Sequence, residues 1–319
     1  MIAIQDVWKA KKRIAPVVGR TPLLHCPALS EQAKGSVYLK LESMHAIGAF
    51  KIRGAANKIL SLAKDEQKRG VTTYSTGNHG LAVAYVAKQI GTKAVICVSR
   101  RVPKAKADAI RKFGGKLEIY GDSQDEAGQR CFELQRKYGM TVIEPFDDPE
   151  VIAGQGTIGL ELLEEQPDID AAVVPLSGGG LISGIALALK ANRPDMKVIG
   201  VSMERSAAMF ESQKAGRPIE LQESDTLADS LLGGIGLENR HTFEMVKRYV
   251  DETILVNETM IADGMTFMMD EHRLVTEGAA AVGVGALLHN ILPVSGNNTA
   301  MIISGKNVDL SAFYKVVKV

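Results

Sequence analysis

The chain has 319 residues, of which 45% are apolar and 24% are charged. A chain of this length and composition can form one large or two ordinary globular domains around a substantial core. Lysine and arginine number 38 against 37 aspartates and glutamates, so the net charge is +1 at pH 7. This balance argues against a general attraction to nucleic acid or to an anionic membrane, so we expect a small-molecule partner.

The cysteines and the N-terminus indicate the compartment. The three cysteines, Cys26, Cys97 and Cys131, are odd in number and show no CxxC spacing, which argues against a disulfide framework or a thiolate zinc site. The N-terminal segment has no continuous apolar region and no small-residue cleavage site. No apolar run reaches the roughly eighteen residues that a membrane span needs. We therefore expect a cytoplasmic protein.

Short β-branched runs alternate with helix-length amphipathic segments along the whole chain. The runs that predict strands are residues 37–41, 71–75, 94–98, 116–120, 171–176, 197–201, 253–256 and 300–303. The alternation predicts an α/β fold, and runs this apolar indicate strands of a parallel sheet covered by helices on both faces. Ligands in such folds bind at the C-terminal ends of strands, beside helix N-termini.

Three stretches interrupt this pattern. Charge and proline cluster at residues 64–70 and 144–150, and both stretches predict linkers. The linkers bracket roughly the second quarter of the chain, which indicates a two-part organisation. The polar segment 216–232 predicts a mobile loop.

The first junction that could carry chemistry is Gly48-Ala49-Phe50-Lys51-Ile52-Arg53-Gly54-Ala55. It predicts Lys51 at the opening of a helix. A cation is disfavoured there by the helix dipole, so the amine loses its proton more easily, as a lysine that forms a Schiff base requires. A solvated surface lysine is the alternative interpretation.

Three further junctions follow predicted strands. Ser75-Thr76-Gly77-Asn78-His79-Gly80 could hold a carboxylate or phosphate at a helix N-terminus, although simple capping is the alternative. Ser177-Gly178-Gly179-Gly180 could wrap a phosphate with backbone N–H groups. A dinucleotide fingerprint fails there because Ser183 stands where its last glycine should be. Ser304-Gly305-Lys306-Asn307 offers a hydroxyl to a heteroaromatic nitrogen, or only a turn.

Together with Val-Thr-Glu-Gly-Ala at 275–279, these motifs resemble, in order and over nearly the whole chain, the fold-type II pyridoxal-phosphate enzymes. Within that class the chain is similar to the serine/threonine dehydratase and serine racemase group. The resemblance implies an α/β fold of two open, mostly parallel sheet domains of the tryptophan synthase beta-like type. Residues 1–65 and 148–319 would form the large cofactor-binding domain. Residues 66–147 would form a small mobile domain that carries the substrate-carboxylate loop.

The resemblance also implies a pyridoxal 5'-phosphate site. Lys51 would hold the cofactor as a Schiff base and then act as the base that takes the α-proton. Ser304, a neutral hydroxyl at the pyridine nitrogen, would favour elimination over transamination. The remaining implied cofactor contacts are Phe50 beside the ring, Asn78 at the 3-hydroxyl, Ser177, Gly178, Gly179, Gly180 and Leu181 around the phosphate, and Glu277 near the cofactor edge.

Ser75, Thr76, Asn78 and His79 would bind the substrate carboxylate, and domain closure would exclude water. Thr76 would also stand on the face opposite the lysine, where a hydroxyl can protonate the α-carbon. The implied reaction is α,β-elimination from a β-hydroxy amino acid such as L-threonine or L-serine, giving a 2-oxo acid and ammonia.

The sequence departs from this group near the expected substrate. Ala49 replaces a familiar serine and Leu81 a common glutamine, so a larger substrate is an alternative to plain threonine or serine. Lys306 replaces a usual glycine and is a rival for Lys51, whose flanking residues match the lysine motif much better.

The divalent-cation site of several relatives has only a partial counterpart. Glu204 and Ala208 fit that site, but Phe210 stands where an acid is needed. We expect weak or absent metal binding at Glu204, and a solvated or capping role is equally compatible.

Several alternatives stay open on the sequence alone. The substrate could instead be 3-hydroxyaspartate or a hydroxy-diaminobutyrate derived from hydroxyectoine, since the dehydratases of that breakdown resemble this chain in the altered lysine loop. A racemase on the same cofactor would yield the D-isomer in place of ammonia. A non-catalytic nucleotide- or amino-acid-binding protein is the alternative from another class. The relatives imply a homodimer or homotetramer.

Overall fold

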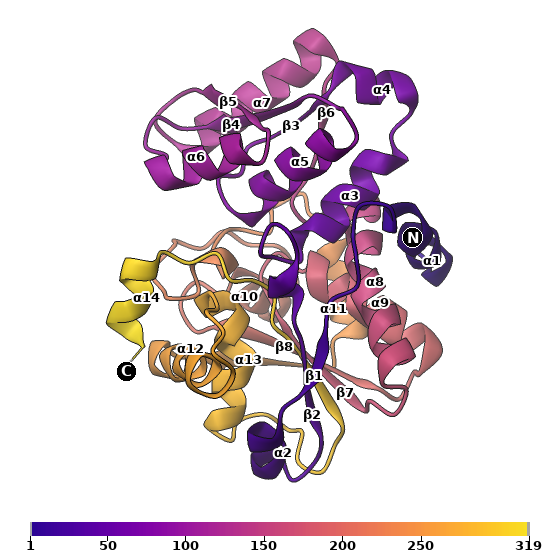
Figure 1. The fold of residues 1–319 in the computed structure, drawn as a ribbon, viewed down its shortest axis with the longest axis vertical. Coiled ribbons are helices and arrows are strands. Elements are labelled where there is room, and N and C mark those ends of the chain that lie inside the picture. The colour runs from indigo at the N-terminus through magenta and orange to yellow at the C-terminus, as the bar shows by residue number, and fades with distance from the viewer. Residues whose placement is uncertain (1, 318–319) are drawn as a thin grey trace.

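The computed structural model describes residues 2–317, which form two open sheets placed one above the other (Figure 1). The larger sheet has the order β1-β2-β10-β7-β8-β9 and the smaller one the order β5-β4-β3-β6. The strands of the larger sheet are β1 Leu23–His25, β2 Val37–Lys40, β7 Ala171–Pro175, β8 Lys197–Met203, β9 Glu252–Val256 and β10 Thr299–Ile302. Those of the smaller sheet are β3 Val71–Thr73, β4 Ala94–Val98, β5 Lys116–Ile119 and β6 Thr141–Val142.

Helices connect the strands and cover both sheets, with α3 at the junction of the two parts (Figure 1). The helices before and within the smaller part are α1 Ile4–Ile14, α2 Pro27–Ala33, α3 Lys51–Ser61, α4 Lys64–Arg69, α5 Asn78–Gln89, α6 Lys104–Lys112 and α7 Gln124–Tyr138. The later ones are α8 Pro149–Glu165, α9 Gly180–Asn192, α10 Ala208–Ala215, α11 Thr242–Tyr249, α12 Glu258–His272, α13 Gly278–Leu288 and α14 Leu310–Val316. Two short 3-10 turns lie at Glu42–Met44 and Asp229–Leu231.

Alternate residues of the central strands pack into hydrophobic clusters on opposite faces of the sheet. In β4, Ile96 packs into the cluster that includes α5, whereas Cys97 packs against α7. In β7, Val173 faces the α12–α13 side and Val174 the α9 side. Because such strands are buried on both faces, they carry apolar residues at every position, which is why they appear as unalternating runs in the sequence.

The predicted α/β class, the eight predicted strands and the mostly parallel pairing are confirmed. The strand pairs are parallel except β1 with β2, which is antiparallel. Strands β1 and β6, with three and two residues, were not predicted because such short segments show no periodicity. The linker predicted at residues 64–70 is wrong, since this stretch forms α4, whose Glu66 carboxylate accepts the N–H of Ala63 at 2.8 Å.

The strands of the smaller sheet lie between residues 71 and 142. The exact domain limits and the mobility of the small domain stay predictions, as does mobility in the 216–232 segment. Cys26, Cys97 and Cys131 are buried and free. Among residues 2–317, no helix is both long and apolar enough to cross a membrane.

Candidate active site

A cavity of about 570 Å³ gathers the predicted cofactor and substrate residues. Its walls come from the beginnings of α3, α5, α9 and α13 and from the end of β10, as expected where parallel strands end beside helix N-termini. The predicted residues that line it are Phe50, Lys51, Ser75, Thr76, Asn78, His79, Ser177, Gly178, Gly179, Gly180, Leu181, Glu277 and Ser304. Their chemical roles stay predictions, but their convergence is a property of the structure.

Lys51 is the first residue of α3, and its Nζ donates a hydrogen bond to the carbonyl oxygen of Pro145 at 2.7 Å. Burial lowers the pKa of this amine to about 8, while the carboxylate of Glu277 acts in the opposite direction. The direction agrees with the sequence argument, and burial is the principal cause. Lys306 is exposed and does not line the cavity, so the structure favours Lys51 over its rival.

The loop from Ser75 to Gly80 brings α5 to the cavity by a close turn. A Cβ at Gly80 would collide with the carbonyl oxygen of Ser75, so glycine is needed at this position. The hydroxyl of Ser75 accepts the N–H of Gly77 at 3.3 Å. The N–H groups in the first turn of α5 have no carbonyl partner within the helix and can bind an anion.

His79 lies at the loop but does not present its ring to a ligand. The ring is buried, and its Nε2 donates to the carbonyl oxygen of Ile143 at 2.8 Å. Burial, followed by the nearby Lys51 amine, lowers the pKa of His79 to about 3, so the ring is neutral. The prediction that His79 belongs to the loop that binds the substrate carboxylate stays a prediction, and because the ring is already bonded to Ile143, we expect the backbone of His79 to take that part.

Asn78 and Glu277 meet across the cavity. The Nδ2 of Asn78 lies 3.1 Å from each oxygen of the Glu277 carboxylate. Burial raises the pKa of Glu277 to about 7, with the hydrogen bond from Asn78 acting against the rise. Asn307 joins this pair by donating from its Nδ2 to the Oδ1 of Asn78 at 2.7 Å. Asn307 belongs to the motif Ser304-Gly305-Lys306-Asn307, but the sequence alone indicates no role for it.

The glycine loop before α9 is held by residues of the predicted linker 144–150. Gly179 has φ of +87° as the N-cap of α9. A Cβ at Gly178 would lie 2.6 Å from the ring of Phe146, so a side chain there would displace that ring. Pro145 and Phe146 thus contact both Lys51 and the glycine loop. In the sequence, only a proline between charged residues marks this segment, and it does not indicate these contacts.

Glu204, the candidate metal ligand, lies elsewhere. It is exposed directly after β8, and its N–H donates to the carbonyl of Val256 at 2.9 Å. Within the described part of the chain, no three His, Cys, Asp or Glu side chains gather in a way that could hold a metal ion. The structure therefore adds no support for a cation at Glu204.

The donor set in the cavity fits pyridoxal 5'-phosphate. A half-buried lysine amine of lowered pKa can form a Schiff base with an aldehyde, and the glycine-rich N-terminus of α9 offers backbone N–H groups to a phosphate. Ser304, buried after β10, supplies a hydroxyl in the same cavity.

Comparison with known proteins agrees with this fit. The family model described as pyridoxal-phosphate dependent enzyme matches residues 14–305, so the chain belongs to that family. It is 43% identical to the L-threonine ammonia-lyase of Thermotoga maritima over 99% of this chain and 78% of that protein. It is 39% identical to the catabolic L-threonine dehydratase of Staphylococcus aureus over 100% of this chain and 92% of that protein.

Solved structures agree as well. The structure of maize serine racemase matches with a TM-score of 0.93 at 34% identity, covering 98% of this chain and 96% of that one. Within the pyridoxal-phosphate enzymes, the chain belongs to the fold-type II threonine dehydratase and serine racemase family, with the tryptophan synthase beta-like fold. This membership removes support for a non-catalytic binding protein.

The lowered pKa of Lys51 gives a prediction for the cofactor-free protein. Because burial disfavours the charged amine, we expect Lys51 to become reactive as the pH rises through about 8. A free lysine standard becomes reactive only near its pKa of about 10.4. Competitive acetylation with acetic anhydride across a pH series, with mass spectrometry of the Lys51 peptide, measures this difference. A Lys51 profile that follows the standard contradicts the prediction.

Proposed function

We propose that the protein is a pyridoxal-phosphate-dependent dehydratase that eliminates water from a β-hydroxy amino acid, with L-threonine as the leading substrate. The observation that carries the proposal is the single cavity that holds the Lys51 amine, the N-terminal glycines of α9 and the loop from Ser75 to Asn78. The L-threonine ammonia-lyase and dehydratase names of the full-length relatives support the choice of substrate.

The reaction needs an electron sink, and bound pyridoxal 5'-phosphate supplies it by withdrawing electrons from the α-carbon of the substrate. Lys51 takes the α-proton on its Nζ, for which its lowered pKa suits it. The hydroxyls of Ser75 and Thr76 and the N–H groups at the start of α5 hold the substrate carboxylate. Ser304 offers a neutral hydroxyl to the ring nitrogen. The β-hydroxyl gains a proton, which balances the α-proton taken by Lys51, and leaves as water. The resulting enamine tautomerises to an imine, and one water molecule hydrolyses the imine to a 2-oxo acid and ammonia.

A second candidate substrate is a larger β-hydroxy amino acid with a cationic side chain, such as the hydroxy-diaminobutyrate derived from hydroxyectoine. Glu223 and Asp229 line the same cavity and offer carboxylates to an ammonium group. A Cβ at Gly233 would have no heavy atom within 4 Å, which leaves room in that wall. Ala49 is buried and provides no hydroxyl beside Lys51. 3-Hydroxyaspartate is disfavoured by the same carboxylates.

The test is a substrate panel on the purified holoenzyme. We expect L-threonine to release ammonia and a 2-oxo acid. Coupled reduction of the 2-oxo acid measures the rate. L-serine, 3-hydroxyaspartate and the hydroxy-diaminobutyrate complete the panel, and chiral chromatography detects any D-isomer. Faster turnover of the diamino substrate than of threonine would favour the second candidate. If the D-isomer forms and no ammonia is released, the protein is a racemase that uses Thr76 on the opposite face, and not a dehydratase. No reaction with any member of the panel contradicts the proposal.

We also propose that the enzyme is cytoplasmic and forms a homodimer or homotetramer. The three free, buried cysteines support a reducing compartment. Light scattering of the purified protein gives the mass of the assembly.

A further inference from the structure

Asn307 connects the two parts of the molecule beside the cavity. It follows β10 of the larger sheet, whereas Asn78 begins α5, which packs on the smaller one. The Nδ2 of Asn307 donates to the Oδ1 of Asn78 at 2.7 Å and to the carbonyl oxygen of Ile47 at 2.8 Å. Both amide hydrogens of Asn307 are thus committed to acceptors.

These bonds determine which way the Asn78 amide faces. Because its Oδ1 accepts from Asn307, its Nδ2 lies toward Glu277, 3.1 Å from each carboxylate oxygen. The backbone N–H of Asn307 also bonds to the Glu277 carboxylate. Asn307, Asn78 and Glu277 therefore form a closed ring of hydrogen bonds in which every donor meets an acceptor.

The orientation of Asn307 is itself fixed. A flipped Asn307 amide would direct its oxygen at the carbonyl of Ile47 and at the Oδ1 of Asn78, which are both acceptors. Gly48, with φ of +75°, allows the close packing, since a Cβ there would lie 2.7 Å from the Oδ1 of Asn307.

We propose that Asn307 is a positioning residue that holds the Asn78 amide with its NH2 group, not its carbonyl, toward the cofactor. The proposal deepens the proposed function, because it rests on Lys51 forming a Schiff base and on Asn78 contacting the ring oxygen of the cofactor. A donor at that oxygen stabilises its negative charge and so makes the Schiff base easier to deprotonate. A carbonyl there has the opposite effect.

The test titrates the visible absorption of the holoenzyme against pH. Asn307→Ala removes the donor without adding charge, and Asn307→Asp replaces it by an acceptor of the same shape. In both variants we expect the pKa of the Schiff base to rise, by about one unit, which corresponds to a tenfold change in the proton equilibrium. We also expect kcat to fall more than KM changes. Asn298→Asp is the matched control, because Asn298 stands just before β10, at its opposite end, and its side-chain amide donates to the exposed carbonyl oxygen of Asp168 at 3.1 Å.

A double-mutant cycle separates positioning from a merely structural effect. If Asn307 acts through Asn78, then Asn307→Ala has no further effect on the Schiff-base pKa in an Asn78→Ala background. The proposal is overturned if both Asn307 variants keep the wild-type pKa of the Schiff base. It is also overturned if the shifts in this pKa caused by Asn307→Ala and Asn78→Ala add fully in the double mutant. Absence of a Schiff base on Lys51 in the wild type, detected by borohydride reduction and peptide mapping, would instead overturn the proposed function on which it rests.

Discussion

Replacement of Lys51 by alanine is expected to lower the rate of 2-oxo acid formation by at least about a thousandfold. A positioned general base alone contributes about a hundredfold to ten-thousandfold, and Lys51 also supplies the amine that binds the cofactor. The variant should lose the Schiff-base absorption, while its unfolding midpoint should stay close to that of the cofactor-free wild type. Coupled 2-oxo acid assays and visible spectra measure both effects.

Two further variants make the Lys51 assignment specific. Lys51→Arg retains the positive charge but cannot form the Schiff base, so it should be as inactive as Lys51→Ala. Lys306→Ala removes the rival lysine, which is exposed and outside the cavity walls, and it should retain wild-type spectra and turnover. A borohydride label found on Lys306 would show that the assignment is wrong.

The sequence was most informative where the residues of one segment reflect that segment's place in the fold. Strands such as β4 and β7 carry apolar residues at every position because helices cover both faces, so their runs predict a parallel sheet. Once the sheet is parallel, the motifs after its strands must meet at one edge. This explains why residues as far apart as Lys51 and Ser304 line one cavity.

Contacts that depend on tertiary structure were not predictable. The His79 ring has a carbonyl of a distant segment as its partner, and nothing beside His79 in the chain indicates this contact. Burial, which only the folded structure reveals, is the main cause of the lowered pKa of Lys51. Asn307 gains its role from Asn78, which is 229 positions away. The charged residues of α4 resemble a linker because that helix has no buried residue.

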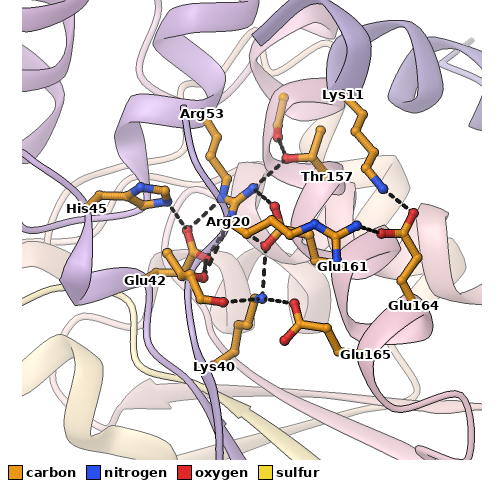
Figure 2. A network of polar contacts seen from close by, with 12 residues as sticks. Lys11, Arg20, Lys40, Glu42, His45, Arg53, Thr157, Glu161, Glu164 and Glu165 are labelled. Carbon is orange, nitrogen blue, oxygen red and sulfur yellow. Dashed lines mark hydrogen bonds and ion pairs between the residues drawn. The ribbon is translucent and has the colours of Figure 1, made fainter. Parts of the chain in front are cut away.

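The second large effect is expected in the buried ion network around Arg53, two residues after Lys51 in α3 (Figure 2). Its Nε and Nη2 donate to the two oxygens of Glu42 at 2.7 and 2.8 Å, and its Nη1 donates to Glu161 at 2.6 Å. The Arg53 side chain is 1% exposed. Lys40 binds Glu161 from the other side at 2.9 Å.

Arg53→Met is expected to destabilise the protein by about 3–5 kcal/mol, because it leaves the buried carboxylates of Glu42 and Glu161 without their principal partner. Urea unfolding with an unchanged m-value measures this loss. Arg111→Met is the matched control: Arg111 and Asp108 form a surface pair, each 53% exposed, so the same substitution should cost no more than about 1 kcal/mol.

The pH dependence distinguishes lost charge pairing from lost packing. Despite the opposing effect of burial, Arg53 and then His45 hold the pKa of Glu42 far below its usual value of 4.5. A depressed carboxyl pKa adds stability that is present above the unfolded-state pKa and is lost as the pH falls. The difference between wild type and Arg53→Met should therefore stay nearly constant between pH 7 and about 5, and it should shrink as the pH falls below the usual carboxyl pKa of 4.5. If the difference in unfolding free energy between wild type and Arg53→Met stays constant with pH, Arg53 stabilises α3, the helix that begins with Lys51, by packing alone.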